Sequence, residues 1–381
     1  MEFKIVFSEG AKITCTELLD FPIKVEFWND ERNYLENSIV INSPGSFATP
    51  KKYFIPWRVK VFKNDEKIHE EKMELNGKNV FIHIDSPSIG DTLAWVSQAV
   101  RFWERYDFNL TVFTDFYFMF QEVYPEIKWV HSKHNDIDPY ARYRISYWLS
   151  PQRFYFNPID PRTSPLAKVA SNILGIDYIE KRPKVKELRE FKNPLEGEKY
   201  VCISTTSTAG AKEWNFTGGW QKIVDYLKEI GYKVIVIQKE PTNLEGVVDM
   251  TGDFFILERA EILRKSDFFV GLPSGISWLS WSVGIPVVMI SGFSSHFAEF
   301  EGDCYRVFSS GSCKPCWNDQ QFIFDKSDWY WCPRNKGTEN QFKCTKDITS
   351  KMVIEKIDLL IKEKNTKRYD KTKEKTSSKE L

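Results

Sequence analysis

The chain has 381 residues, enough for about two or three domains with a sizeable core. Lysine plus arginine and aspartate plus glutamate number 53 each, so no net field attracts nucleic acid or an anionic membrane. The N-terminal residues lack a basic segment followed by an apolar one, so we expect no export signal and a cytoplasmic protein. In a reducing compartment, the seven cysteines are expected to be free thiols and metal ligands rather than disulfides.

The first 77 residues are predicted to form an N-terminal β-rich domain. Short apolar stretches such as Phe3–Phe7, Lys24–Trp28 and Arg58–Phe62 are separated by turns that contain Asn, Pro and Gly. None of these stretches carries a pattern typical of catalysis. We expect this domain to serve assembly or acceptor docking.

From residue 78 the pattern changes to strands that alternate with helices. Val80–Ile84 is an apolar strand, and Asp91–Tyr106 has the spacing of an amphipathic helix. We predict an α/β protein with a first Rossmann-like domain over residues 78–195 and a second over 196–300, facing each other across a cleft. The second domain begins with the buried strand Tyr200–Ser204.

The uncharged stretch Phe268–Gly292 has the length of a membrane span, but its glycines, prolines and serines divide it. We read it as a strand, a turn, a short helix and a second strand within a parallel sheet. Such a turn brings backbone amides close to phosphate, and Ser274 and Ser277 are expected to cap the helix or contact the phosphate. The alternative is a buried structural unit whose serines only cap a helix.

Asp91 is the candidate general base, because it lies where a strand and loop lead into a helix. The alternative is a plain helix N-cap, a position that aspartate favours. In the second domain, Lys212 is placed to meet a diphosphate leaving group, or else to be a solvated loop lysine. Thr205 and Thr206 follow a strand at the edge where open sheets bind ligands, and Glu240 is a candidate for ribose hydroxyls or an ordinary loop residue.

Four cysteines predict a metal finger over residues 301–350, with a C-terminal helix at 351–365 and a disordered tail at 366–381. CKPC is followed after fifteen residues by a third cysteine and after eleven more by a fourth. Four thiolates complete a tetrahedral structural site for zinc or for iron. The proposed ligands are Cys313, Cys316, Cys332 and Cys344.

These pieces together resemble the bacterial autotransporter heptosyltransferases, relatives of the lipopolysaccharide heptosyltransferases with the GT-B fold. The matching segments are SPSIGDTLAW (86–95), TSTAGAKEWN (206–215), the stretch 271–293 and the cysteine run. Within the wider group, a turn resembling Ser274-Gly275-Ile276-Ser277 is followed by His, where this chain has Trp278. That departure implies that contacts to the donor differ here.

The resemblance implies an inverting transfer of heptose from ADP-heptose to serine hydroxyls of an autotransporter adhesin. It implies that Asp91 is the base and that Lys212 and the turn bind the diphosphate. It also implies a structural iron in the finger, with zinc as the alternative, and a ring-like homo-oligomer such as a dodecamer. The substrate-binding residues carried over are Thr205, Thr206, Lys212, Trp214, Glu240, Ser274, Gly275, Ile276 and Ser277.

Other functions remain open from the sequence, among them a GT-B glycosyltransferase that uses another nucleotide sugar. A lipopolysaccharide core heptosyltransferase would need a basic amphipathic helix facing lipid, and the helix at 91–106 carries balanced charges instead. A non-catalytic assembly protein that binds a metal or a sugar nucleotide would not need Asp91 and Lys212.

Overall fold

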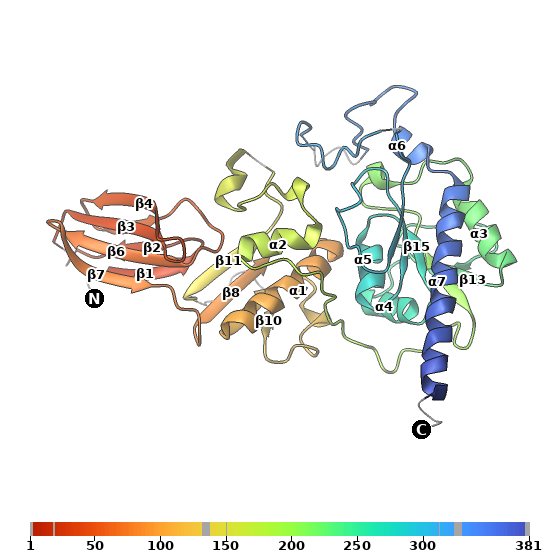
Figure 1. The fold of residues 1–381 in the computed structure, drawn as a ribbon, viewed down its shortest axis with the longest axis horizontal. Coiled ribbons are helices and arrows are strands. Elements are labelled where there is room, and N and C mark those ends of the chain that lie inside the picture. Colours follow the sequence, from red (N-terminus) through yellow and green to blue (C-terminus); the bar gives the residue numbers. More distant parts are fainter. Residues whose placement is uncertain are drawn as a thin grey trace. The chain divides into compact units, whose positions relative to one another are not determined.

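The computed structural model describes residues 3–17, 20–131, 138–149, 151–311, 313–323 and 330–377. Its side chains are described as far as Thr366, apart from Pro151. The chain divides into two compact units, Met1–Lys184 and Val185–Leu381 (Figure 1). No helix among the described residues is long and apolar enough to cross a membrane.

The first unit is built on a seven-stranded sheet in the order β10-β9-β8-β11-β1-β2-β5. Its strands are β1 (Phe3–Ser8), β2 (Lys12–Cys15), β5 (Gly45–Ala48), β8 (Asn79–Ile84), β9 (Asn109–Phe113), β10 (Lys128–Val130) and β11 (Ala141–Ile145). The strands from β10 to β1 pair in parallel, whereas β2 and β5 add antiparallel. Strands from the N-terminal 77 residues therefore continue the Rossmann-like sheet. The finer domain boundaries predicted from the sequence stay predictions.

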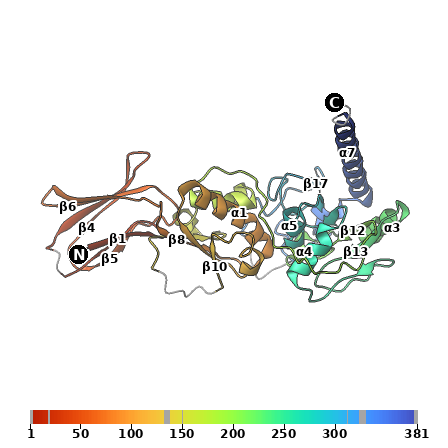
Figure 2. The same cartoon turned by 90° about the horizontal axis from the view of Figure 1, so that it is seen from below.

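A second sheet in this unit is antiparallel and has the order β4-β3-β6-β7. Its strands β4 and β6 are labelled in Figure 2. Its strands are β3 (Ile23–Asn29), β4 (Tyr34–Ile41), β6 (Trp57–Lys63) and β7 (Glu66–Lys72). Alternate residues of β6 face the core, and Val59 and Val61 are fully buried. This is the two-residue period expected of a sheet with one covered face.

Two helices of the first unit pack against each other. They are α1 (Ile89–Tyr106) and α2 (Leu166–Leu174), and the indole N–H of Trp95 donates to the backbone oxygen of Leu166 at 2.9 Å. The other helical segments are the 3₁₀ turns η1 (Tyr117–Met119), η2 (Pro151–Tyr155) and η3 (Pro161–Thr163). Because Trp95 is fully buried and hydrogen-bonded, it fixes how α1 crosses α2.

The second unit has a six-stranded parallel sheet in the order β14-β13-β12-β15-β16-β17. Its strands are β12 (Tyr200–Ile203), β13 (Lys233–Val236), β14 (Val248–Asp249), β15 (Phe269–Gly271), β16 (Val287–Ile290) and β17 (Cys304–Val307). Every residue of β12, β15 and β16 is buried, as expected for parallel strands covered on both faces.

The helical segments of this unit are η4 (Gly210–Lys212), α3 (Gly219–Glu229), α4 (Ile256–Arg264), α5 (Gly275–Ser282), α6 (Lys343–Lys346) and α7 (Ser350–Ser377). α3 and α7 lie side by side (Figure 1), and their apolar residues share one core cluster with the sheet. The helix α7 continues beyond residue 365, where the sequence predicted its end, and residues 378–381 lie outside the described residues.

The packing of α7 can be tested with two neighbouring leucines. Leu360 is fully buried in the core cluster, whereas Leu359 is 39% exposed. We expect Leu360→Ala to lower the free energy of unfolding by roughly 2–5 kcal/mol, because it removes buried contacts and leaves a cavity. Leu359→Ala, which has the same helix propensity change, should cost about 0.5 kcal/mol or less. Chemical denaturation measures both, and equal losses would contradict the docking of α7 through Leu360.

Candidate functional site

Asp91 lies in the first turn of α1, after the loop that follows β8. The N-cap of α1 is Ser88, so the alternative that Asp91 is itself the N-cap does not hold. The hydroxyl of Ser86 donates to Asp91 Oδ2 at 2.6 Å, and the backbone N–H of Ser88 donates to Ser86 Oγ at 3.1 Å. The half-buried carboxylate is thereby held in one orientation at the carboxyl end of β8, near the positive end of a helix.

An ion pair that the sequence did not predict lies beside this loop. Arg144 donates through Nε and Nη2 to Asp85 Oδ2, at 2.9 and 2.5 Å. Asp85 follows β8, and Arg144 lies in the neighbouring parallel strand β11. The only signal for this pair was that both residues are polar and lie near the same edge of the sheet.

In the second unit, three predicted donor-site residues come together after β12 and β13. The backbone N–H and the hydroxyl of Thr205 donate to Gln238 Oε1 at 2.7 and 3.1 Å. The hydroxyl of Thr206 donates to Glu240 Oε2 at 2.8 Å. Because β12 and β13 are adjacent and parallel, their carboxyl ends bring these side chains to one edge of the sheet.

A second carboxylate lies near Glu240. Burial raises the pKa of Glu213 above its usual range, and the negative charge of Glu240 raises it further. Two carboxylates at this edge need cationic or hydroxyl partners when an anionic ligand approaches.

Lys212 ends the 3₁₀ turn η4 in the loop between β12 and α3. Its backbone N–H donates to the oxygen of Ala209 at 2.9 Å. Lys212 is half-buried, and among the residues that the structure describes its ammonium has no ion pair and no hydrogen bond. An unpaired lysine at the ligand edge of a parallel sheet is suited to an anionic ligand.

Ser274 is the N-cap of α5, as the sequence predicted, but its side chain makes no capping hydrogen bond. Its Oγ is buried and, within the described residues, has no partner. Ser277 differs, since it is fully buried and its hydroxyl donates to the oxygen of Leu272 at 2.5 Å. The hydroxyl of Ser277 is therefore used inside the fold. Gly275, Ile276 and Ser277 can instead offer backbone N–H groups, which have no intrahelical acceptor in the first turn.

Trp214 lies in the core of the second unit. Only 5% of the residue is exposed, and its indole N–H donates to the backbone oxygen of Ile348 at 2.7 Å. Its ring is nearly parallel to that of Phe216 and edge-on to that of Trp220. These contacts position the loop that carries Lys212, and they leave the indole N–H of Trp214 no free hydrogen for a substrate.

The four predicted cysteine ligands lie near one another. Burial raises the pKa of Cys344 to about 12, and proximity to the other three cysteines adds to this rise. The backbone N–H of Phe342 donates to Cys332 Sγ at 3.5 Å, and Asn335 Nδ2 lies 4.0 Å from Cys313 Sγ. Nevertheless, over the described ranges no group of three or more His, Cys, Asp or Glu side chains is arranged to hold a metal ion. The donor set itself fits zinc or iron, because these ions accept four thiolates and ligand sulfurs are stabilised by N–H donors.

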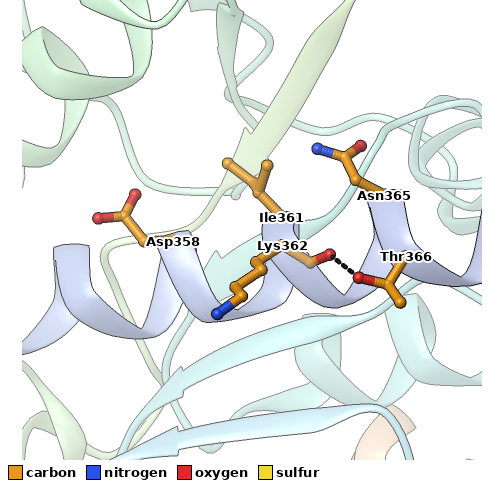
Figure 3. A pocket seen from close by; sticks show the side chains of 5 residues that line it. All are labelled: Asp358, Ile361, Lys362, Asn365 and Thr366. Carbon is orange, nitrogen blue, oxygen red and sulfur yellow. Dashed lines mark hydrogen bonds between the residues drawn. The ribbon is translucent and has the colours of Figure 1, made fainter.

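An open recess lies along α7 and is separate from these residues (Figure 3). It is lined by Asp358, Ile361, Lys362, Asn365 and Thr366. All five come from one helix, and the Thr366 hydroxyl donates to the oxygen of Lys362 at 3.0 Å. It lacks converging polar groups from several elements, so we assign no ligand to it.

No family model matches the chain. The autotransporter heptosyltransferase Aah of Escherichia coli is 38% identical to it over 329 residues, which cover 81% of each chain. A relative from Burkholderia thailandensis is described as the inactive autotransporter heptosyltransferase BimC. It is 30% identical to this chain over 322 residues, which are 81% of this chain and 75% of BimC.

Solved structures agree with these relatives. The dodecameric iron-containing heptosyltransferase TibC, in complex with ADP-D-beta-D-heptose, superposes with a TM-score of 0.87 at 32% identity, covering 95% of this chain and 96% of that one. The lipopolysaccharide heptosyltransferase II of E. coli has a TM-score of 0.52 at 12% identity, covering 75% of this chain and 99% of that one. The second likeness shows only that the GT-B-like fold is shared.

Proposed function

The chain belongs to the autotransporter heptosyltransferase family and is a heptosyltransferase, and we propose that it transfers heptose from ADP-heptose to serine hydroxyls of an autotransporter adhesin. The observation that carries this proposal is the edge of the second sheet where β12 and β15 end. There the unpaired ammonium of Lys212 and the N-terminus of α5 at Ser274 follow adjacent parallel strands. Both features favour the negative charge of a diphosphate.

The proposed reaction is a single inverting displacement. Asp91 takes the proton from the acceptor serine as its oxygen attacks the anomeric carbon of heptose. The bond from that carbon to the diphosphate oxygen breaks on the opposite side, and ADP leaves with the bonding electrons. Lys212, the Ser274 hydroxyl and the backbone N–H groups of the α5 N-terminus stabilise the charge that develops on the leaving oxygen.

The nucleoside part of ADP is assigned to the edge after β12 and β13. Glu240, whose carboxylate already accepts a hydrogen bond from Thr206, is the proposed acceptor for the ribose hydroxyls. Thr205 supports this loop through its two bonds to Gln238.

The proposal includes one structural metal ion per chain, held by Cys313, Cys316, Cys332 and Cys344. Similarity to an iron-containing relative favours iron, while zinc fits the same four thiolates. The ion would supply the cross-link that holds the cysteine loops together, since binding energy becomes folding energy when the ligands meet only in the folded state. By the same similarity we propose a homo-oligomer of the dodecameric type. We also propose that the protein acts in the cytoplasm.

A lipopolysaccharide acceptor is the alternative substrate, and a non-catalytic role is the alternative to any transfer. The relative described as inactive makes the second alternative worth a direct test. The decisive experiment is co-expression of the chain with a candidate autotransporter, followed by mass spectrometry of the adhesin. Heptose on serine supports the proposal, and an unmodified adhesin with modified lipopolysaccharide core contradicts it.

We expect Asp91→Asn to reduce transfer by about 10²–10⁴-fold while ADP affinity and folding are retained, because only the proton acceptor is lost. Single-turnover transfer to the adhesin and calorimetry with ADP measure the two effects. The control is Asp115→Asn, which changes an exposed aspartate of the same unit. Near wild-type turnover of Asp91→Asn would leave Asp91 only a structural part in the first turn of α1.

Lys212→Ala should weaken ADP affinity by roughly 10- to 100-fold, since a charge-assisted contact contributes about 1.5–3 kcal/mol. Transfer should slow together with binding, because the diphosphate is charged in both the ground state and the transition state. Lys351→Ala, on the exposed face of α7, is the matched control. Unchanged ADP affinity in calorimetry would remove Lys212 from the donor site.

Cys332→Ser should lose the metal, and with it thermal stability, because three thiolates no longer complete the site. Elemental analysis of the purified chain should give one ion per wild-type chain, with iron colouring the protein and zinc leaving it colourless. Cys304→Ser, a half-buried cysteine of β17 outside the proposed ligand set, should keep its metal. Substoichiometric metal in the wild type, or full metal in Cys332→Ser, would contradict the assignment.

A further inference from the structure

Two segments of the second unit are in direct contact with each other. We call residues 204–218, between β12 and α3, the donor loop, because they include Thr205 and Lys212. We call residues 313–323 and 330–346 the cysteine finger. Contacts between the two lie on both sides of Lys212.

After Lys212, a hydrogen bond joins the donor loop to the finger. Asn215 Nδ2 donates to Thr345 Oγ1 at 2.9 Å and to the backbone oxygen of Glu213 at 2.8 Å. Thr345 is fully buried and directly follows Cys344 in α6. The Asn215 amide therefore links the backbone beside Lys212 to the residue next to a proposed metal ligand.

Before Lys212, the contact is made by packing. Ala211 is 1% exposed and forms an apolar cluster with Phe293, Cys316 and Trp331. The ring of Tyr330 lies so close to Gly210 that a Cβ added there would be 2.6 Å from it. Any side chain at position 210 would displace the Tyr330 ring, so glycine is needed there. The backbone of η4 therefore contacts the finger directly.

Trp214 anchors the donor loop after Lys212, but in the described part of the chain no polar contact fixes the Lys212 side chain itself. Its side chain has no polar partner over the described residues, and the regular structure of the loop is the three-residue turn η4. Ordering such a loop on ligand binding costs conformational entropy. A support that orders the loop beforehand removes part of that cost and raises affinity.

We propose that the cysteine finger is a positioning element for Lys212. With its metal bound, the finger holds the donor loop in the conformation in which the ammonium meets the diphosphate of ADP, an inference that rests on the proposed function. Thr345, Tyr330 and Asn215 are the positioning residues, and none of them needs to touch the donor.

The proposal also predicts an effect of ADP on metal binding, which can be measured without an activity assay. If bound metal favours the loop conformation that binds ADP, then bound ADP must favour metal retention by the same factor. Full-length protein loaded with metal is titrated with increasing concentrations of chelator, and retained metal is measured by elemental analysis with and without saturating ADP. We expect ADP to shift the chelator midpoint by roughly 5-fold or more. An identical midpoint would overturn the proposal.

A double-mutant cycle tests the bond that carries the coupling. Asn215→Leu and Thr345→Val each remove one partner, and each should weaken ADP affinity by about 5- to 10-fold with metal content unchanged. The double variant should bind no more weakly than the weaker single variant. Additive effects, or unchanged ADP affinity at full metal content, would overturn the coupling.

Thr345→Ser, which retains the hydroxyl, is the matched control and should bind ADP as the wild type does. If Thr345→Val fails to fold, Tyr330→Ala tests the packing contact with Gly210 in place of the hydrogen bond, and it should also weaken ADP affinity at full metal content. Tyr330 is 62% exposed, so its loss leaves no cavity in a core. Lys212→Ala separates the two proposals. If it leaves ADP affinity unchanged, the assignment of Lys212 to the donor site fails, whereas if only the finger variants leave ADP affinity unchanged, the positioning role alone fails.

Discussion

The parallel pairing of β12, β13, β15 and β16 is the constraint on which the rest of the second unit depends. Parallel neighbours end at the same edge, so loops far apart in the sequence meet there. All residues of β12, β15 and β16 are buried, which leaves no place for an exposed polar group within them. Polar chemistry must therefore come from loops, and those loops need support from outside the strands.

Buried polar side chains provide part of that support. Gln238, 2% exposed, accepts both hydrogen bonds of Thr205. Arg259 Nη2 donates to the backbone oxygens of Gln238 and Gly252, at 3.1 and 2.5 Å. Burial lowers the pKa of Arg259, while Glu240 and Asp253 oppose that shift, so the guanidinium stays charged. One cation thus ties together the loops after β13 and β14.

The sequence predicted features that depend on local patterns. Val80–Ile84 and Tyr200–Ser204 are continuous apolar runs, and they correspond to β8 and β12. It could not predict that β1 would pair with β11, placing Phe7 beside Ala141, because no local pattern encodes a parallel pairing over such a separation. The ion pair between Asp85 and Arg144 was missed for the same reason.

Within the candidate site, residue type and position predicted the neighbourhood but not the direction of each side chain. Thr206 and Glu240 follow adjacent strands and are hydrogen-bonded to each other, as their positions in the sequence led us to expect. Ser274 and Ser277 looked equivalent in the sequence, yet only the Ser277 hydroxyl is taken up by a backbone oxygen. Trp214 lies in a loop with polar neighbours, but its contact with Ile348 comes from a segment much later in the chain. Such choices depend on tertiary packing.

This separation between strands and loops explains how family members can share a fold and differ in activity. The core of the second unit is an apolar cluster from the sheet, α3 and α7, and it contains neither Lys212 nor Ser274. Substitutions in the loops can therefore remove chemistry while the fold persists. The cysteine finger is the exception, since Ala211 next to Lys212 belongs to the apolar cluster that includes Cys316. At that point the cysteine finger packs against the residue next to Lys212, a candidate donor-site residue, so the proposed chemistry and the packing of the finger share one contact.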